Sequence, residues 1–149
     1  MQQQQRAQEQ ERQRHSQPVY TTSSQRGEHH AEQREIWQRN RASNWQSDHH
    51  EWRERGGYHG YRIPENRYRG YFGPSHFFRL SFLPVVYVSG RPRFEYEGYW
   101  FVLEDPWPPE WSDDWYDSDD MYVEYFDDGY YLCDHRHPGY RVAISVFVG

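Results

Sequence analysis

The sequence contains little that would support covalent cross-links, membrane insertion or catalysis. Cys133 is the only cysteine among 149 residues, which excludes an intramolecular disulfide and a metal site built from several cysteines. No apolar run approaches the ~20 residues that a bilayer-crossing helix needs, and the Gln-rich start lacks the features of a secretory signal. No nucleophile elbow, phosphate-binding loop, zinc helix motif or dinucleotide fingerprint occurs. We therefore expect no enzymatic activity, no cofactor and no membrane-spanning segment.

Lysine is also absent, so all 17 basic residues are arginine. Residues 1–93 hold 15 arginines and 9 acidic residues, a balance of +6, whereas residues 94–149 hold 2 arginines and 14 acidic residues, a balance of −12. The planar guanidinium group suits contacts with carboxylates and aromatic rings, so pairing between the two halves is the simplest use of this asymmetry. The acidic half would repel phosphate, and no RNA- or DNA-binding motif occurs. We expect no nucleic-acid partner.

Aliphatic side chains are scarce, and aromatic side chains take their place. Hydrophobic residues make up 35% of the chain and the mean hydropathy is −1.27, yet 7 Trp, 14 Tyr and 8 Phe account for 19% of all residues. Disordered sequences lack aromatic residues at this level. The length suits one domain, so we expect a tail and one small domain whose core is packed mainly from rings.

The first third of the chain divides into a tail and a helix. Residues 1–27 are mainly Gln, Arg, Glu, Ser and Thr, so burial cannot offset the cost of ordering them, and we predict a disordered tail. Residues 28–55 contain neither Pro nor Gly, and Trp37, Trp45 and Trp52 recur at spacings that return a helix to nearly the same face. This pattern predicts one amphipathic helix over residues 28–55, docked on the domain through its tryptophans.

Residues 58–149 have the pattern of an antiparallel β domain. After a short helix that starts at Pro64, β-branched and aromatic runs alternate with turn residues. The clearest signal is a hairpin in which residues 121–126 and 130–133 flank an Asp-Asp-Gly turn, where the Asp-Gly pair would supply positive φ angles. The other predicted strands cover residues 76–82, 85–88, 93–96, 99–103 and 140–148, the last of them at or next to an edge.

These segments together define the predicted fold class. It is α+β and mainly β: a small antiparallel sheet domain of about six strands over residues 58–149, preceded by one amphipathic helix and a disordered Gln-rich tail.

An ordered series of short motifs resembles a known group of proteins. The motifs are Arg-Gly-Gly-Tyr (55–58), Gly-Tyr-Arg-Ile-Pro (60–64), Arg-Gly-Tyr-Phe-Gly (69–73), Gly-Arg-Pro-Arg-Phe (90–94), Gly-Tyr-Trp-Phe (98–101), Asp-Pro-Trp-Pro (105–108), Asp-Asp-Gly-Tyr-Tyr-Leu (127–132) and His-Pro-Gly (137–139). Over residues 37–149 they resemble uncharacterised small exported proteins of soil bacteria, Acidobacteria especially. This resemblance implies a periplasmic or secreted location and a signal peptide removed from the mature form, and it implies no particular activity. Residues 122–148 are also similar to RcnB-type periplasmic proteins of nickel and cobalt homeostasis.

A proline-stiffened stretch supplies the first candidate site. In residues 105–111 the prolines lower the entropy lost on ordering, while Trp107, Trp111 and, further on, Trp115 present flat rings. Exposed rings would form a binding platform for sugars or a proline-rich peptide. Buried rings would instead close one open end of the sheet, which suits a domain with few aliphatic residues.

A second candidate is a metal site. Cys133, His135 and His137 alternate, so a continuing strand would project all three to one side as ligands for zinc or nickel. The following Pro-Gly pair favours an ordinary polar turn instead. Two weaker possibilities are a transition-metal surface formed by the histidine doublets at 29–30 and 49–50, and a calcium loop formed by the acidic residues between 110 and 120, whose spacing does not fit an EF-hand.

The sequence therefore favours a non-catalytic module of the bacterial envelope or exterior, structural or binding in role. It would act on an unknown protein or glycan partner through aromatic and arginine contacts, and self-association is compatible with this role. The alternative is a periplasmic divalent-metal binder for nickel or zinc.

Overall fold

The computed structural model describes residues 33–148. Ile36–Gly149 forms one compact unit, and Met1–Glu35 is grouped separately. The predicted disordered tail, residues 1–27, and the predicted start of the helix, residues 28–32, lie outside the described residues. Within the described range, none of the helices has the length and hydrophobicity needed to cross a membrane.

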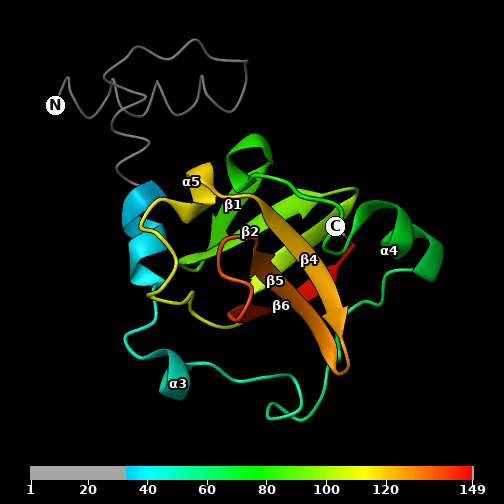
Figure 1. Ribbon diagram of the computed structural model, residues 1–149, viewed down its shortest axis with the longest axis horizontal. Coiled ribbons are helices and arrows are strands. Elements are labelled where there is room, and N and C mark those ends of the chain that lie inside the picture. Colours follow the sequence, from blue (N-terminus) through cyan, green and yellow to red (C-terminus); the bar gives the residue numbers. More distant parts are fainter. Residues whose placement is uncertain (1–32, 149) are drawn as a thin grey trace, which may run out of the picture. The chain divides into compact units, whose positions relative to one another are not determined.

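Six antiparallel strands organise the compact unit (Figure 1). They lie in the order β1-β2-β3-β6-β5-β4, with bounds Val85–Val88 (β1), Arg91–Tyr96 (β2), Tyr99–Leu103 (β3), Met121–Phe126 (β4), Gly129–Asp134 (β5) and Arg141–Phe147 (β6). Short helices flank them: α3 (Trp45–Asp48), α4 (Glu65–Tyr71), the 3-10 turn η1 (Leu80–Phe82) and α5 (Trp115–Ser118). A further helical segment includes residues 33–39. This architecture confirms the predicted fold class, α+β and mainly β.

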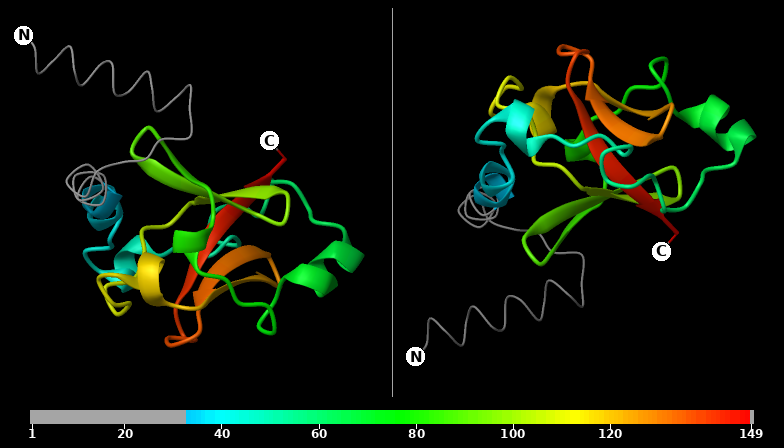
Figure 2. Two further views of the ribbon diagram at one scale, coloured as in Figure 1. Left: turned by 90° about the horizontal axis from the view of Figure 1, so that it is seen from above. Right: turned by 90° about the horizontal axis from the view of Figure 1, so that it is seen from below.

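Strand β6 lies at the centre of the sheet and joins its two halves. Residues 141–143 pair with β5, and residues 144–147 pair with β3. Figure 2 shows β6, in red, running between these halves. Val142, Ala143 and Ile144 are buried in succession, so both faces of the sheet are covered at this point. The predicted position at or next to an edge is wrong, since an alternating pattern does not reveal how many strands flank it.

The β4–β5 hairpin is present as predicted, but its turn differs. Phe126 pairs with Gly129, so Asp127 and Asp128 form the two-residue turn and Gly129 already belongs to β5. The positive φ of 42° falls on Asp127, and Gly129 has no positive φ. Packing explains the glycine instead: a Cβ atom on Gly129 would overlap the indole ring of Trp52.

Replacing Gly129 by alanine is expected to lower the free energy of unfolding by about 2 kcal/mol, because an overfilled contact displaces the Trp52 indole. The displaced ring loses a 2.9 Å hydrogen bond from its Nε1–H to the carbonyl oxygen of Tyr130. Urea denaturation followed by circular dichroism measures the loss. Gly139→Ala is the matched control, since a Cβ there meets nothing within 4 Å. Equal losses in the two variants would contradict this explanation.

Residues 28–55 do not form one helix. The helical segment at residues 33–39 ends there, and the next helix is the single turn α3. Between them the backbone pairs with Trp107, whose N–H donates to the carbonyl of Asn40 and whose carbonyl accepts from the N–H of Ala42, both at 2.8 Å. Tertiary hydrogen bonds thus override the helical preference of this stretch.

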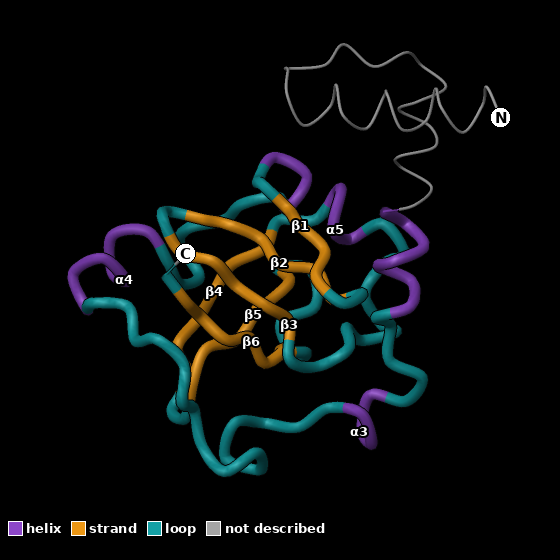
Figure 3. The backbone as a smooth tube through the Cα atoms, turned by 180° about the vertical axis from the view of Figure 1, so that it is seen from behind, coloured by secondary structure: helices purple, strands orange, loops and turns teal. Residues whose placement is uncertain are grey.

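The break in the helix lets its three tryptophans reach different neighbours. Trp37 is buried edge-on against Trp115 with centroids 5.1 Å apart, Trp45 lies edge-on to Tyr140 at 6.0 Å, and Trp52 covers the start of β5. The chain then runs from α3 to α4 as a long loop (Figure 3), which pairs with β6 where the N–H of residue 61 donates to the carbonyl of residue 146 at 2.9 Å. One straight helix would have placed all three rings on a single surface.

Residues 76–82 are also predicted as a strand, and this prediction is wrong. Only Phe78 pairs in β fashion, as an isolated bridge to Met121 at the start of β4, and the chain then enters η1. The backbone N–H and carbonyl groups of Phe78 and Met121 bond to each other at 2.8 Å. This short contact covers part of the outer edge of β4, which an open sheet would leave unpaired.

Candidate binding pocket

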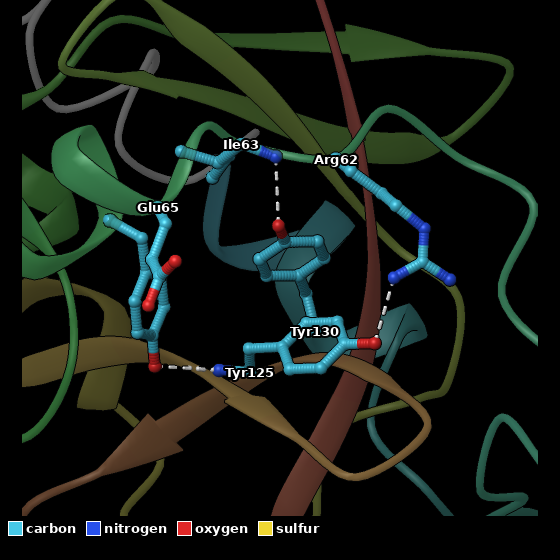
Figure 4. Close-up of a pocket in the computed structure, with 6 residues that line it drawn as sticks. Arg62, Ile63, Glu65, Tyr125 and Tyr130 are labelled. Carbon is cyan, nitrogen blue, oxygen red and sulfur yellow. Dashed lines mark hydrogen bonds between the residues drawn. The ribbon is translucent and has the colours of Figure 1, made fainter.

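A pocket of about 410 Å³ opens between the start of α4 and the β4–β5 hairpin. It is lined by three tyrosines, one aliphatic residue and one residue of each charge: Arg62, Ile63, Glu65, Tyr68, Tyr125 and Tyr130. Figure 4 shows Arg62 and Glu65 on opposite sides of this group. Ile63 and Tyr130 are buried, whereas Arg62 and Glu65 are exposed. The pocket thus combines an apolar interior with a charged rim.

Proline and glycine place α4 beside β4. Pro64, with φ −55°, directly precedes the first helical residue Glu65, and its ring fixes a φ that suits a helix start. Gly73 follows the helix with φ 87°, a conformation that side chains disfavour. This turn lets the N–H of Gly73 donate to the carbonyl of Val123 in β4 at 2.7 Å. The C-terminal end of α4 is therefore fixed relative to the strand that carries Tyr125.

Each phenol in the pocket accepts a hydrogen bond from nitrogen. The backbone N–H of Ile63 donates to the Tyr130 hydroxyl at 2.8 Å. The backbone N–H of Tyr125 donates to the Tyr68 hydroxyl, and Nη1 of Arg62 donates to the Tyr125 hydroxyl, both at 2.8 Å. The rings are therefore held at both ends, and each hydroxyl keeps its own proton to donate.

The rings and the guanidinium group of Arg62 form one contact cluster. Tyr125 and Tyr130 meet edge to face with centroids 5.0 Å apart, and Arg62 lies 5.8 Å from the centroid of the Tyr125 ring. Burial raises the pKa of Tyr130, so its phenol stays protonated at neutral pH. The hydrogen bond to Tyr125 raises the pKa of Arg62 above its ordinary value, so this side chain keeps its charge.

The predicted tryptophan platform is wrong. Trp107, Trp111 and Trp115 are 0%, 1% and 0% exposed, so none of them presents a ring to a ligand. They pack on one another, with Trp115 5.1 Å from Trp37 and 4.7 Å from Trp111. In place of aliphatic side chains, these indoles fill the space where residues 36–42 meet the loop before β4.

The three predicted metal ligands do not form a site. Cys133 is 1% exposed within β5, and burial raises the pKa of its thiol to about 12, which disfavours the thiolate that binds metals. β5 ends at Asp134, so the expected alternation of side chains does not continue to the two histidines. His135 is exposed, with its ring 4.6 Å from the Phe77 ring, and His137 lies in the following turn. Among residues 33–148, no group of three or more His, Cys, Asp or Glu side chains could hold a metal ion.

The arginines of the first half pair with acids of the second, as the charge asymmetry predicts. The pairs are Arg41–Asp113 at 3.6 Å, Arg79–Asp120 at 3.2 Å, Arg91–Glu104 at 3.4 Å and Arg55–Asp105. The Arg55–Asp105 pair is the most buried of the four. The Asp105 carboxylate also lies 3.1 Å from Nδ1 of His49 and accepts from the N–H of Ala143 at 3.4 Å. These acids and this histidine thus have structural partners.

No local sequence pattern predicts the pocket, because its residues come from a loop, a helix and two strands. The one usable signal is that Gly-Tyr-Arg-Ile-Pro places Arg62 directly before a helix start, next to an aromatic-rich run. Comparison of the chain with protein-family models, with curated proteins and with solved structures finds no match.

Proposed function

We propose that the protein is a non-catalytic binding module of the bacterial envelope or exterior that holds a glycan in this pocket through aromatic and arginine contacts. One observation carries the proposal: ring faces, phenol hydroxyls and both signs of charge converge on a single opening of about 410 Å³. Ligand sites in proteins combine such apolar walls with a few fixed polar groups. The resemblance to exported proteins supports the location.

Sugars have chemistry that matches this lining. The C–H face of a pyranose ring packs on aromatic rings, and its hydroxyls require donors and acceptors at fixed positions. Tyr68 and Tyr125 are half-buried, so their rings are partly open to a ligand, and their hydroxyls are already held by hydrogen bonds. Groups fixed in advance lose little freedom on binding. A protein partner would need about 20 to 30 residues on each side, whereas six residues line the pocket.

The proposal is tested by titrating the ¹⁵N-labelled protein with a panel of neutral and acidic oligosaccharides at millimolar concentration. We expect amide resonance shifts that cluster on Arg62, Ile63, Tyr125 and Tyr130, and we expect Tyr125→Ala to weaken binding at least tenfold because it removes one ring and one hydroxyl. Tyr71→Ala is the matched control, since this exposed tyrosine does not line the pocket. The proposal would be ruled out if no sugar of the panel shifted these resonances, or if Tyr125→Ala left the shifts unchanged.

A further inference from the structure

The polar groups that face the pocket donate hydrogen bonds far more than they accept them. The hydroxyls of Tyr68, Tyr125 and Tyr130 each already accept one bond from nitrogen. What each hydroxyl most readily offers a ligand is therefore its O–H proton. Arg62 has only N–H donors and uses one of them on Tyr125. A ligand that fits this lining must supply acceptors.

The charge at the pocket points the same way. Within residues 33–148, no carboxylate lies within ion-pair distance of the Arg62 guanidinium, unlike those of Arg41, Arg55, Arg79 and Arg91. The one acidic residue of the lining is Glu65, whose side chain is 83% exposed and lies 3.8 Å from Arg69. The arginine therefore keeps an uncompensated positive charge next to the phenols, and the carboxylate of Glu65 is turned toward solvent and partly neutralised.

Resting on the proposed function, we infer that the pocket selects a glycan unit that carries a carboxylate, namely a hexuronic acid residue. The carboxylate accepts from the remaining N–H groups of Arg62, a charge-assisted contact that is stronger than a neutral one. The ring hydroxyls accept from the phenol O–H groups, and the C–H face of the sugar packs on Tyr125. A quaternary ammonium ligand, the other guest of tyrosine-rich pockets, is disfavoured by the charge of Arg62.

Isothermal titration calorimetry with digalacturonate and with its neutral counterpart galactobiose tests the inference. We expect the acidic disaccharide to bind the full chain at least tenfold more tightly. Arg62→Gln is expected to remove this preference, while Glu65→Gln is expected to raise the affinity for digalacturonate several-fold because it removes the only negative charge of the lining. Arg79→Gln is the matched control: it makes the same change in net charge as Arg62→Gln, and Arg79 lies outside the pocket.

Four outcomes would overturn the inference. Equal affinities for the two disaccharides would remove the role of the carboxylate while leaving the pocket as a glycan site. Tighter binding of 4-hydroxybenzoate than of digalacturonate would assign the carboxylate to an aromatic acid instead of a sugar. A preference that Arg62→Gln leaves intact, or that Arg79→Gln removes equally, would show that the anion binds elsewhere. Binding of neither disaccharide would also overturn it, and the broader oligosaccharide titration then decides the proposed function separately.

Discussion

Replacing Trp115 by alanine is expected to lower the free energy of unfolding by about 3 to 5 kcal/mol, the usual cost of truncating a large buried side chain. Its indole is 0% exposed and lies at the centre of a cluster, in ring contact with Trp37, Trp107 and Trp111 at centroid distances of 5.1, 6.0 and 4.7 Å. The cavity would therefore border three other indoles. Urea denaturation followed by far-ultraviolet circular dichroism measures the loss.

Two further variants make this prediction specific. Trp100 is only half-buried and has no ring partner among the described aromatic side chains, so Trp100→Ala is expected to cost far less. Trp115→Phe keeps a ring in the cluster and removes an indole N–H that is buried without a hydrogen-bond partner among the described residues, so less than half of the alanine loss is expected. If Trp115→Ala costs no more than Trp100→Ala, the tryptophan cluster is not the part of the core that holds residues 36–42 to the sheet.

Elements specified by neighbouring residues are predictable from the sequence. The strands 85–88 and 121–126 are found with their bounds unchanged, because β-branched and aromatic runs stop at residues that form turns. The same local pattern assigns Gly129 to a turn. In the structure Gly129 lies in β5, and its missing side chain leaves room for the ring of Trp52, which is distant in the sequence. Local patterns therefore place strands well, and they do not reveal why a given residue occupies a position.

Elements specified by distant contacts are not predictable in this way. The pattern at residues 28–55 favours a helix, and it fails because Trp107 pairs with the backbone of Asn40 and Ala42. The pocket depends on Arg62 meeting Tyr125, 63 residues further along the chain. A single sequence contains no information on such pairings beyond the residue types. Composition predicts an aromatic core, and of the two alternatives for Trp107, Trp111 and Trp115 the structure shows the buried one.

The protein is expected to lose about 3 kcal/mol of its free energy of unfolding as the pH rises from 4 to 8. Asp134 is 0% exposed and Asp119 is 1% exposed. Burial, with a smaller contribution from the adjacent Asp119 carboxyl, raises the pKa of Asp134 from 3.8 to about 7. Arg136 lies 3.7 Å from Asp119, but its side chain is 68% exposed, so its charge is screened. Asp134 therefore keeps its proton across the acidic range.

Stability falls as the pH rises because the folded protein holds this proton more tightly than the unfolded chain. Between pH 4 and pH 7 the folded protein keeps a proton on Asp134 that the unfolded chain has already released, so raising the pH favours unfolding. The stabilisation is complete below pH 4, declines as the pH approaches 7, and is lost above it. Urea denaturation at half-unit intervals of pH measures this profile.

Asp119→Asn separates this pair from every other titrating group. The substitution removes the negative charge of the Asp119 carboxylate, and the new amide N–H donates to the carboxylate of Asp134. Both changes favour the charged form, so the pKa of Asp134 falls toward its ordinary value. We expect the decline in stability between pH 4 and pH 7 to become shallower, and the variant to be more stable than the wild type at pH 8. All other titratable groups are the same in both proteins, so their contributions cancel in the difference. Parallel profiles for the two proteins would show that the Asp119 carboxyl does not raise the pKa of Asp134.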